Sequence, residues 1–225
     1  MERIGLSKLR IVEGRTKLTT SHNGKDITFL HPAYGPGDYT NVGLQIGQNG
    51  LSRPTMAQTA SLIHTAFNSE DRYSDEIIGI IKRGLFWVFT GSLYALKGAY
   101  VQDDPEIRDR MPFMEESELI RRLEKNDPSV RFVPFGFKVG EMSLRELADN
   151  GYVKALAGEE SAEKLAEVAS KFRGNPILFS LDNTKEPTTR VSALGSDRVL
   201  SGRLYVDGSH GNDMGGYAFG ISKTG

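Results

Sequence analysis

Apolar residues recur at helical spacing in four parts of the chain. The clearest is residues 54–67, where an apolar stripe on one helix face consists of Met56, Ala60, Ile63 and Phe67. Thr55 and Gln58 have the spacing of a capping box, which predicts that this helix begins beside them. Further helices are predicted at residues 74–83, 115–125 and 161–172. Ser143 and Glu146 form a second capping box, which predicts the start of another helix that Asn150 and Gly151 interrupt.

Other apolar runs lack helical spacing and predict strands. Residues 85–90 and 93–101 are two such runs, and Gly91 and Ser92 between them suit a type II′ hairpin turn. Because residues 85–89 are all apolar, this strand needs cover on both faces and is predicted to be central in a sheet. Shorter strands are predicted at residues 26–30, 131–135, 177–181, 189–194, 199–206 and 217–221.

Glycine and proline mark the expected breaks in these elements. Pro32 is predicted to end the strand at residues 26–30. Residues 34–50 are rich in glycine, which disfavours a continuous helix, so this segment is predicted to be a loop with at most a short strand at residues 42–46. Residues 207–216 are predicted to be a second glycine-rich loop.

The order of these elements predicts the fold class. Strands and helices come in separate runs, without the regular alternation of a parallel α/β fold. We therefore expect an α+β fold with a mainly antiparallel sheet and amphipathic helices packed on it. Residues 1–225 are expected to form a single compact domain, with the charged residues 102–128 as a surface excursion.

The composition and the net charge exclude several classes of site and disfavour several classes of partner. The 225 residues include 28 Lys and Arg, 29 Asp and Glu and no Cys, which excludes disulfides, thiolate metal sites and a cysteine nucleophile. The formal net charge of −1 gives no general attraction to nucleic acid or anionic lipid. The longest apolar run, residues 84–96, is too short to span a bilayer as a helix, and residues 1–20 lack a secretory signal pattern. We therefore expect a cytoplasmic protein that makes no membrane contact.

Paired carboxylates follow the second apolar strand. Asp103 and Asp104 come directly after residues 93–101, where a rigid strand could hold a catalytic carboxylate. Together with Glu106 they could bind a divalent cation through oxygen ligands. A solvated turn at Asp104-Pro105 explains the same residues without any chemistry, and the sequence favours that interpretation.

Two further places could carry binding or catalytic groups. The loop at residues 207–216 brings together Asp207, His210 and Asp213, which could serve as a catalytic histidine with two binding carboxylates, although a plain hairpin loop explains them as well. Arg53 precedes the first predicted helix, whose unpaired amides could hold an anion. An ordinary capped helix is the alternative there.

The familiar catalytic motifs are absent from the sequence. Neither phosphate-binding glycine motif occurs in its required context, no G-x-S-x-G elbow is present, and no two of the four histidines have zinc-binding helical spacing. The broken helices at residues 143–172 carry more acidic than basic residues, which argues against a recognition helix for DNA. The sequence therefore identifies no metal and no cofactor.

Three function hypotheses remain open. The first is a non-catalytic protein that binds a partner or forms a homo-oligomer, and the failure of every catalytic motif favours it. The second is a hydrolase or transferase, with or without Mg²⁺ or Ca²⁺, in which Asp103 or Asp104 meets Asp207, His210 or Asp213 in one pocket. The third is a nucleic-acid-binding protein, which the net charge disfavours.

Overall fold

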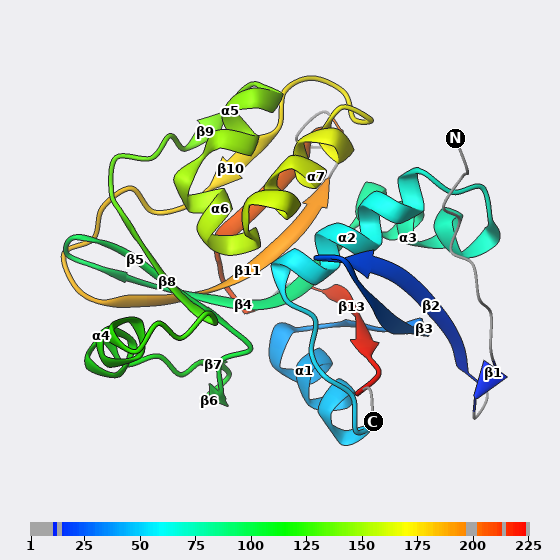
Figure 1. The fold of residues 1–225 in the computed structure, drawn as a ribbon, viewed down its shortest axis with the longest axis horizontal. Coiled ribbons are helices and arrows are strands. Elements are labelled where there is room, and N and C mark those ends of the chain that lie inside the picture. Colours follow the sequence, from blue (N-terminus) through cyan, green and yellow to red (C-terminus); the bar gives the residue numbers. More distant parts are fainter. Residues whose placement is uncertain (1–10, 13–14, 197–201, 213–214, 224–225) are drawn as a thin grey trace.

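Figure 1 shows a computed structural model of the chain, which describes residues 11–12, 15–196, 202–212 and 215–223. Its helices are α1 (Tyr39–Gln48), α2 (Met56–Phe67), α3 (Arg72–Arg83), α4 (Glu116–Glu124), α5 (Leu144–Asp149), α6 (Gly151–Ala157) and α7 (Glu159–Ala169). Its strands are β1 (Ile11–Val12), β2 (Arg15–His22), β3 (Lys25–Gly37), β4 (Leu85–Ala95), β5 (Gly98–Asp103), β6 (Ile107–Arg108), β7 (Met111–Pro112), β8 (Val130–Pro134), β9 (Gly140–Glu141), β10 (Ile177–Phe179), β11 (Thr188–Ser196), β12 (Leu204–His210) and β13 (Gly216–Ile221). The predicted α+β class is confirmed.

Eleven of these strands form one mostly antiparallel sheet with β4 at its centre. The order is β1-β2-β3-β13-β4-β11-β12-β10-β9, while β5 pairs with β4 and β8 pairs with β5. β11 lies along one side of β4 for most of its length, so β13 and β5 share the other side. The pairs β4–β13 and β10–β12 are parallel. Central placement of β4 agrees with the prediction made for residues 85–90.

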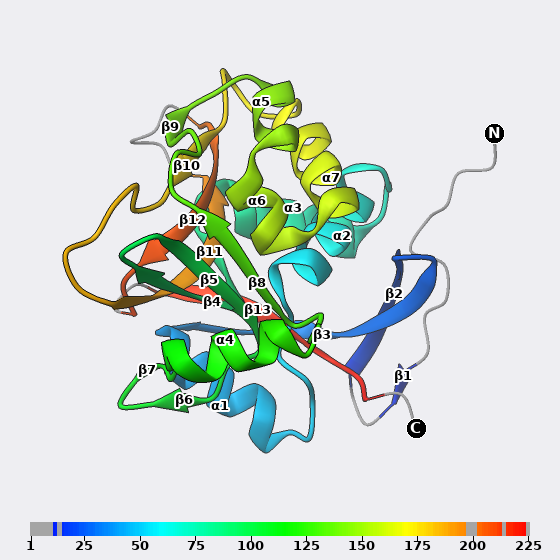
Figure 2. The same cartoon turned by 60° about the vertical axis from the view of Figure 1, so that its left-hand side comes forward.

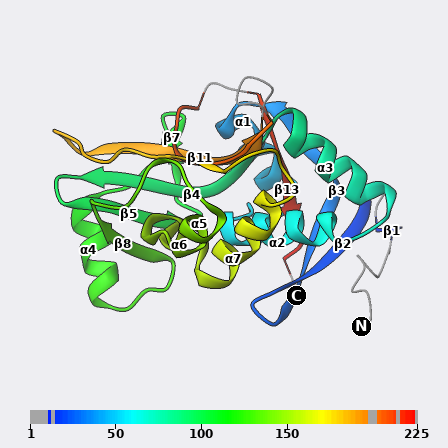
Figure 3. The same cartoon turned by 90° about the horizontal axis from the view of Figure 1, so that it is seen from above.

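The sheet lies between two helical layers: in Figure 1, α5, α6 and α7 lie above β4, and α1 and α4 lie below it, and Figure 3 views the molecule from the side of α5, α6 and α7. Alternate residues of β4 point to opposite faces. Phe86 and Val88 contribute to a large core with α2, α3, α5, α6 and α7, whereas Trp87 and Phe89 pack on the other face against α1. Farther along that second face, α4 covers the sheet and lies beside β8 (Figure 2). Side chains on the two faces of β4 therefore belong to two separate hydrophobic cores.

A group of hydroxyls joins α6 to the sheet. The Tyr152 hydroxyl lies 2.7 Å from Ser92 Oγ and 2.6 Å from the Tyr94 hydroxyl, and Tyr94 donates to the Gly208 carbonyl oxygen at 2.9 Å. Burial raises the pKa of Tyr94 to about 12. A Cβ atom on Gly208 would lie 2.0 Å from the Tyr152 hydroxyl oxygen. Glycine at this position makes room for the tyrosine, and β12 continues past it to His210, so the start of the predicted loop at residues 207–216 is strand.

The prediction of a loop at residues 34–50 is wrong. β3 continues to Gly37, passing Pro32 where its pairing with β13 is irregular, a position that tolerates proline. α1 follows, because the Asp38 carboxylate accepts a hydrogen bond from the Asn41 amide at 2.7 Å and caps the helix. The buried residues of α1 fall on one helix face, and they are Tyr39, Val42, Gly43 and Ile46. Burial of this face outweighs the low helix propensity of glycine.

The predicted hairpin turn at Gly91 and Ser92 is also wrong. β4 runs without a break from Leu85 to Ala95, and the chain reverses after it, before β5 begins at Gly98. A Cβ atom on Gly91 would lie 3.0–3.1 Å from side chains of the 102–128 segment, namely Met114, Pro105 and Pro112. Glycine therefore lets this segment pack closely on the strand and makes no turn there.

The predicted helix starts agree well with the structure. Both capping boxes are present, at Thr55 with Gln58 and at Ser143 with Glu146. α3 begins two residues earlier than predicted, because Asp71 caps it by accepting hydrogen bonds from the amides of Tyr73 and Ser74. No helix within the described residues is long and apolar enough to cross a membrane.

Candidate ligand-binding site

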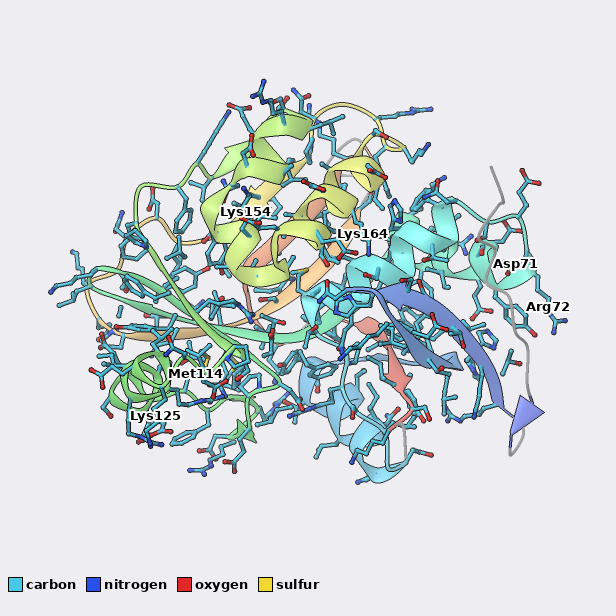
Figure 4. All side chains as sticks on the ribbon, in the orientation of Figure 1. Asp71, Arg72, Met114, Lys125, Lys154 and Lys164 are labelled. Atoms are coloured by element: carbon cyan, nitrogen blue, oxygen red, sulfur yellow. The ribbon has the colours of Figure 1, made fainter. Side chains whose placement is uncertain are left out.

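A cleft of about 480 Å³ lies between the β2–β3 hairpin and α3. Its lining combines charged, aromatic and hydroxyl side chains, namely Thr16, His31, Pro32, Arg72, Tyr73 and Glu76. Figure 4 labels Arg72 and its neighbour Asp71 at the start of α3, on the side of the molecule that carries the hairpin.

Local structure explains why these side chains converge. Thr16 and His31 are directly paired across β2 and β3, so their side chains lie on the same face of the hairpin. The Asp71 cap fixes the first turn of α3, which places Tyr73 in that turn and Glu76 nearly one turn later. The β2–β3 hairpin and the start of α3 therefore form opposite walls of the cleft.

His31 and Glu76 connect the two walls. His31 Nε2 lies 2.7 Å from Glu76 Oε2, and the imidazole meets the Tyr73 ring edge-on with ring centroids 5.0 Å apart. The imidazole also stacks with the Phe219 ring, with the ring centroids 6.3 Å apart. These contacts fix the ring of His31, so one carboxylate and one imidazole occupy defined positions in the cleft.

The Tyr73 hydroxyl has two hydrogen-bond partners in the cleft. The Thr16 hydroxyl lies 3.4 Å from the Tyr73 hydroxyl, and Arg72 Nη2 donates a hydrogen bond to it. Hydrogen bonding by Thr16 and by Arg72 lowers the pKa of Tyr73 from its ordinary value, since both stabilise the phenolate form. The Arg72 guanidinium also lies over the Tyr73 ring, 4.6 Å from its centroid. A cation and a polarised phenol are therefore adjacent.

A smaller hollow of about 130 Å³ lies between α2 and α7. His64 Nε2 and Glu167 Oε2 are 2.6 Å apart at its rim. The cleft beside the hairpin is larger and collects more kinds of polar group, so it is the stronger candidate.

Asp103, a predicted catalytic residue, is held by an arginine. Arg131 Nη1 and Nη2 donate to its two carboxylate oxygens at 2.6 and 2.8 Å, and the Thr90 hydroxyl donates to Oδ1 at 2.9 Å. Arg131 also donates to the Ala155 carbonyl oxygen at the end of α6. This network joins β4, β5, β8 and α6. Asp103 therefore helps to hold these elements together, and its catalytic role stays a prediction.

Asp104 and Arg53, predicted as catalytic and binding residues, pair with each other. Arg53 Nε donates to Asp104 Oδ1 at 2.5 Å, and Arg53 Nη2 donates to the Pro105 carbonyl oxygen at 2.9 Å. Burial raises the pKa of Asp104, which the Arg53 charge partly opposes. Two amides in the first turn of α2 already have side-chain partners, because Met56 N donates to Thr90 Oγ1 and Gln58 N donates to Thr55 Oγ1. Arg53 therefore connects the segment before α2 to Asp104 and Pro105, and its role in anion binding stays a prediction.

Asp207 lies in the middle of β12, and His210 is its last residue. The Ser209 amide donates to Asp207 Oδ1 at 2.8 Å, and burial raises the pKa of the Asp207 carboxyl. His210 Nδ1 lies 2.7 Å from the Gly211 carbonyl oxygen, and its ring meets Trp87 edge-on at 5.2 Å. Asp213, the third residue predicted here, lies outside the described residues.

The structure keeps the two groups of candidate residues apart. Asp207 pairs with Ala193, which pairs with Trp87, so its side chain belongs to the face of the sheet that α1 covers. Asp103 pairs with Thr90 and bonds its hydroxyl on the opposite face. β4 and β11 also lie between the strands that carry them. The single pocket that the hydrolase or transferase hypothesis requires is therefore not formed by Asp103 and Asp207.

The described residues contain no group of three His, Asp or Glu side chains placed to hold a metal ion. Asp103, Asp104 and Glu106, which the sequence offered as oxygen ligands for a divalent cation while favouring a solvated turn, bond separately to Arg131, Arg53 and Arg108.

Comparison with known proteins identifies a similar fold. No protein-family model matches the chain, and no curated protein matches it. A solved structure on the accommodation of massive sequence variation in Nanoarchaeota by the C-type lectin fold is similar, with a TM-score of 0.57 and 14% sequence identity. The match covers 85% of this chain and 97% of that chain. The fold resembles the C-type lectin fold. At this identity the likeness describes architecture alone.

Sequence reasoning missed the cleft altogether. In the sequence, His31 is one of four histidines without zinc-binding spacing, Glu76 lies in the helix predicted at residues 74–83, and Arg72 and Tyr73 lie outside every predicted element. No local motif links position 31 to positions 72–76. Their proximity depends on how the hairpin packs against α3, which spacing along the chain does not reveal.

Proposed function

We propose that this protein acts by binding, and that the cleft between the β2–β3 hairpin and α3 takes a small ligand that carries an anionic group and hydroxyl groups. The observation that carries the proposal is the convergence of a guanidinium, an imidazole, a carboxylate and two hydroxyls on one cleft of about 480 Å³. Largely preformed concave sites with a few convergent polar groups are the usual places where proteins bind small molecules.

Arg72 supports the anionic part of this ligand. Its side chain is exposed at the start of α3, and its Nη2 atom is fixed by the Tyr73 hydroxyl. A planar guanidinium matches the two oxygens of a carboxylate or of a related oxyanion. The helix dipole adds a small favourable effect at the same end of α3.

The other lining groups support the hydroxyl part. The Glu76 carboxylate can accept hydrogen bonds, and the hydroxyls of Thr16 and Tyr73 can both donate and accept. A ligand hydroxyl likewise donates and accepts, so it can bridge such groups in a way that a purely apolar molecule cannot. A small hydroxylated carboxylic acid therefore fits the chemistry of the cleft.

The likeness to the C-type lectin fold is compatible with this proposal. The similar structure concerns a fold that accommodates massive sequence variation. A fold that accommodates sequence variation suits a protein that acts through residues on its surface. This argument is an analogy between folds.

Isothermal titration calorimetry with D-glucuronate and D-glucose tests the proposal, because the two sugars differ in the carboxylate. We expect saturable binding of glucuronate and at least about tenfold weaker binding of glucose. Arg72→Gln is expected to weaken glucuronate binding by a similar factor, whereas Arg145→Gln, on an arginine whose side chain is 93% exposed on α5, is expected to leave it unchanged. Absence of saturable glucuronate binding, or equal binding by Arg72→Gln, would overturn the proposal.

Self-association is a second candidate, and an exposed apolar group favours it. Leu96 at the β4–β5 turn is 70% exposed, and Phe132 on β8 is 39% exposed with its ring 4.8 Å from that of Tyr100. Sedimentation velocity tests this candidate. If the group joins two copies, Leu96→Glu makes the oligomer dissociate while Leu44→Glu, on the exposed side of α1, does not; a monomeric wild-type chain would exclude it.

A further inference from the structure

His31 and Glu76 form a carboxylate–imidazole pair in the lining of the cleft. Glu76 Oε2 lies 2.7 Å from His31 Nε2, and the two side chains are 45% and 17% exposed. An ionised carboxylate only accepts hydrogen bonds, so a neutral imidazole in this pair carries its proton on Nε2. The lone pair is then on Nδ1. The pair therefore determines which ring nitrogen of His31 is able to take up a proton.

This second ring nitrogen of His31 is unpaired and accessible. Within the part of the chain that the structure describes, no group forms a hydrogen bond with Nδ1. The buried side-chain atoms that lack a hydrogen-bond partner there include no atom of His31. Nδ1 is therefore not enclosed by protein, and it belongs to a ring that lines the cleft and that Tyr73 and Phe219 hold in place.

Arg72 gives the same cleft a positive charge. Its Nη2 atom donates a hydrogen bond to the Tyr73 hydroxyl, while its Nη1 and Nε atoms have no partner among the described residues. N–H groups of a guanidinium bind an oxyanion more strongly than they bind a neutral carbonyl oxygen. The cleft therefore combines a proton acceptor, His31 Nδ1, with a group that stabilises developing negative charge.

We propose that this cleft hydrolyses the lactones of hydroxylated carboxylic acids, with His31 as the general base that activates water. The inference rests on the proposed function, because the product of the reaction is the anionic ligand expected in the cleft. A lactone is the neutral, cyclised form of such an acid. A site that binds the anion more tightly than a neutral sugar also favours the negatively charged transition state over the neutral lactone, which is the condition for catalysis.

The reaction uses groups that line the cleft. His31 Nδ1 takes a proton from water as the water oxygen bonds to the lactone carbonyl carbon, and Arg72 donates hydrogen bonds to the carbonyl oxygen that becomes negative. The bond from that carbon to the ring oxygen then breaks, and His31 returns the proton to this oxygen, which becomes a hydroxyl group. The new acid loses its proton to solvent. Glu76 stabilises the imidazolium that exists between the two proton transfers.

A second histidine–glutamate pair provides a matched control. His64 Nε2 and Glu167 Oε2 are 2.6 Å apart, and both residues line the smaller hollow of about 130 Å³ between α2 and α7. Among the described residues that line this hollow there is no arginine. The pairing is therefore alike in the two places, whereas the guanidinium belongs only to the cleft.

Hydrolysis of D-glucuronolactone to D-glucuronate by the full chain tests the proposal, with acid release followed by pH-stat titration and corrected for the rate without protein. We expect saturable hydrolysis by the wild type, a kcat at least about 100-fold lower in His31→Gln, and wild-type kinetics in His64→Gln. Circular dichroism checks that both variants fold. A wild-type rate equal to that without protein, or an unchanged kcat in folded His31→Gln, would overturn the proposal.

The pH dependence of the wild-type reaction is a readout that requires no variant. The titratable groups that face His31 in the cleft are Arg72, Tyr73 and Glu76 of α3. We expect kcat to fall toward acidic pH as the imidazole of His31 takes up a proton, and a kcat that ignores pH would contradict its role as the base.

Calorimetry with glucuronate separates this inference from the proposed function on which it rests. Saturable binding of glucuronate without hydrolysis of the lactone would refute the reaction alone. Absence of both would refute the binding proposal as well.

Discussion

Replacement of Asp103 by asparagine tests whether the ion pair at the end of β5 holds the sheet to α6. The substitution keeps the size of the side chain and removes its charge. Two hydrogen bonds from Arg131, at 2.6 and 2.8 Å, then meet a neutral amide, and one of the two carboxylate oxygens becomes an NH₂ group that cannot accept.

The burial of the pair sets the size of the effect. Fully buried pairs cost about 3–5 kcal/mol when one partner is removed, and exposed pairs contribute about 0–1 kcal/mol. The side chains of Asp103 and Arg131 are 24% and 27% exposed, which lies between these cases. We therefore expect Asp103→Asn to lower the free energy of unfolding by about 2 kcal/mol, and the melting temperature by roughly 4–8 °C for a chain of this size.

Urea denaturation followed by circular dichroism measures this loss as a lower midpoint with an unchanged slope. Asp149→Asn serves as the control, because Asp149 is 65% exposed and its ion-pair distances to Arg145 and Lys154 are 3.7 Å. That variant is expected to unfold like the wild type. A midpoint for Asp103→Asn that matches the wild type would refute the structural role of the pair.

Three further predictions concern helix caps, packing and pH. Thr55→Ala removes the side-chain oxygen that caps α2 and should cost about 1 kcal/mol in urea denaturation, whereas an unchanged midpoint would mean that the cap is redundant. Gly43→Ala should cost about 1–3 kcal/mol by the same assay, because the new Cβ would lie 2.7 Å from Phe89 Cε1, and a stabilised variant would contradict this packing. Burial and Lys164 lower the pKa of His22, so the folded chain binds fewer protons there than the unfolded chain, and stability should fall as pH drops below the ordinary value of 6.5. His22→Gln should lack this component, and identical pH profiles for the two proteins would disprove it.

Local signals in the sequence were sufficient for the helices that carry their own caps. Thr55 and Ser143 caused α2 and α5 to be predicted at nearly their observed starts, because a capping box is formed by residues three apart. The α+β class followed from the order of elements in the same way. These features depend on neighbours along the chain, which the sequence displays directly.

The roles of two glycines were predicted wrongly, because they depend on contacts with segments distant in the sequence. Gly91 accommodates the side chains of a distant segment, and Gly43 lets α1 approach Phe89, yet both were interpreted as signs of turn or loop. The candidate cleft has the same character, since His31 and Glu76 meet only after β3 packs beside α3. Contacts between distant segments determine which residues meet at such positions, and the spacing of residues along the chain does not reveal these contacts.

The four histidines provide the most direct test that the cleft is the binding site, because each reports on a different place. Their neighbours are Ser61 for His22, Glu76 for His31, Glu167 for His64 and Trp87 for His210. The measurement is an NMR titration of the chain, labelled with ¹⁵N-histidine, with D-glucuronate at constant pH. We predict that the imidazole signals of His31 shift and saturate while those of His64 and His210 stay in place. Saturating shifts at His64 or His210 with a stationary His31 would contradict the account.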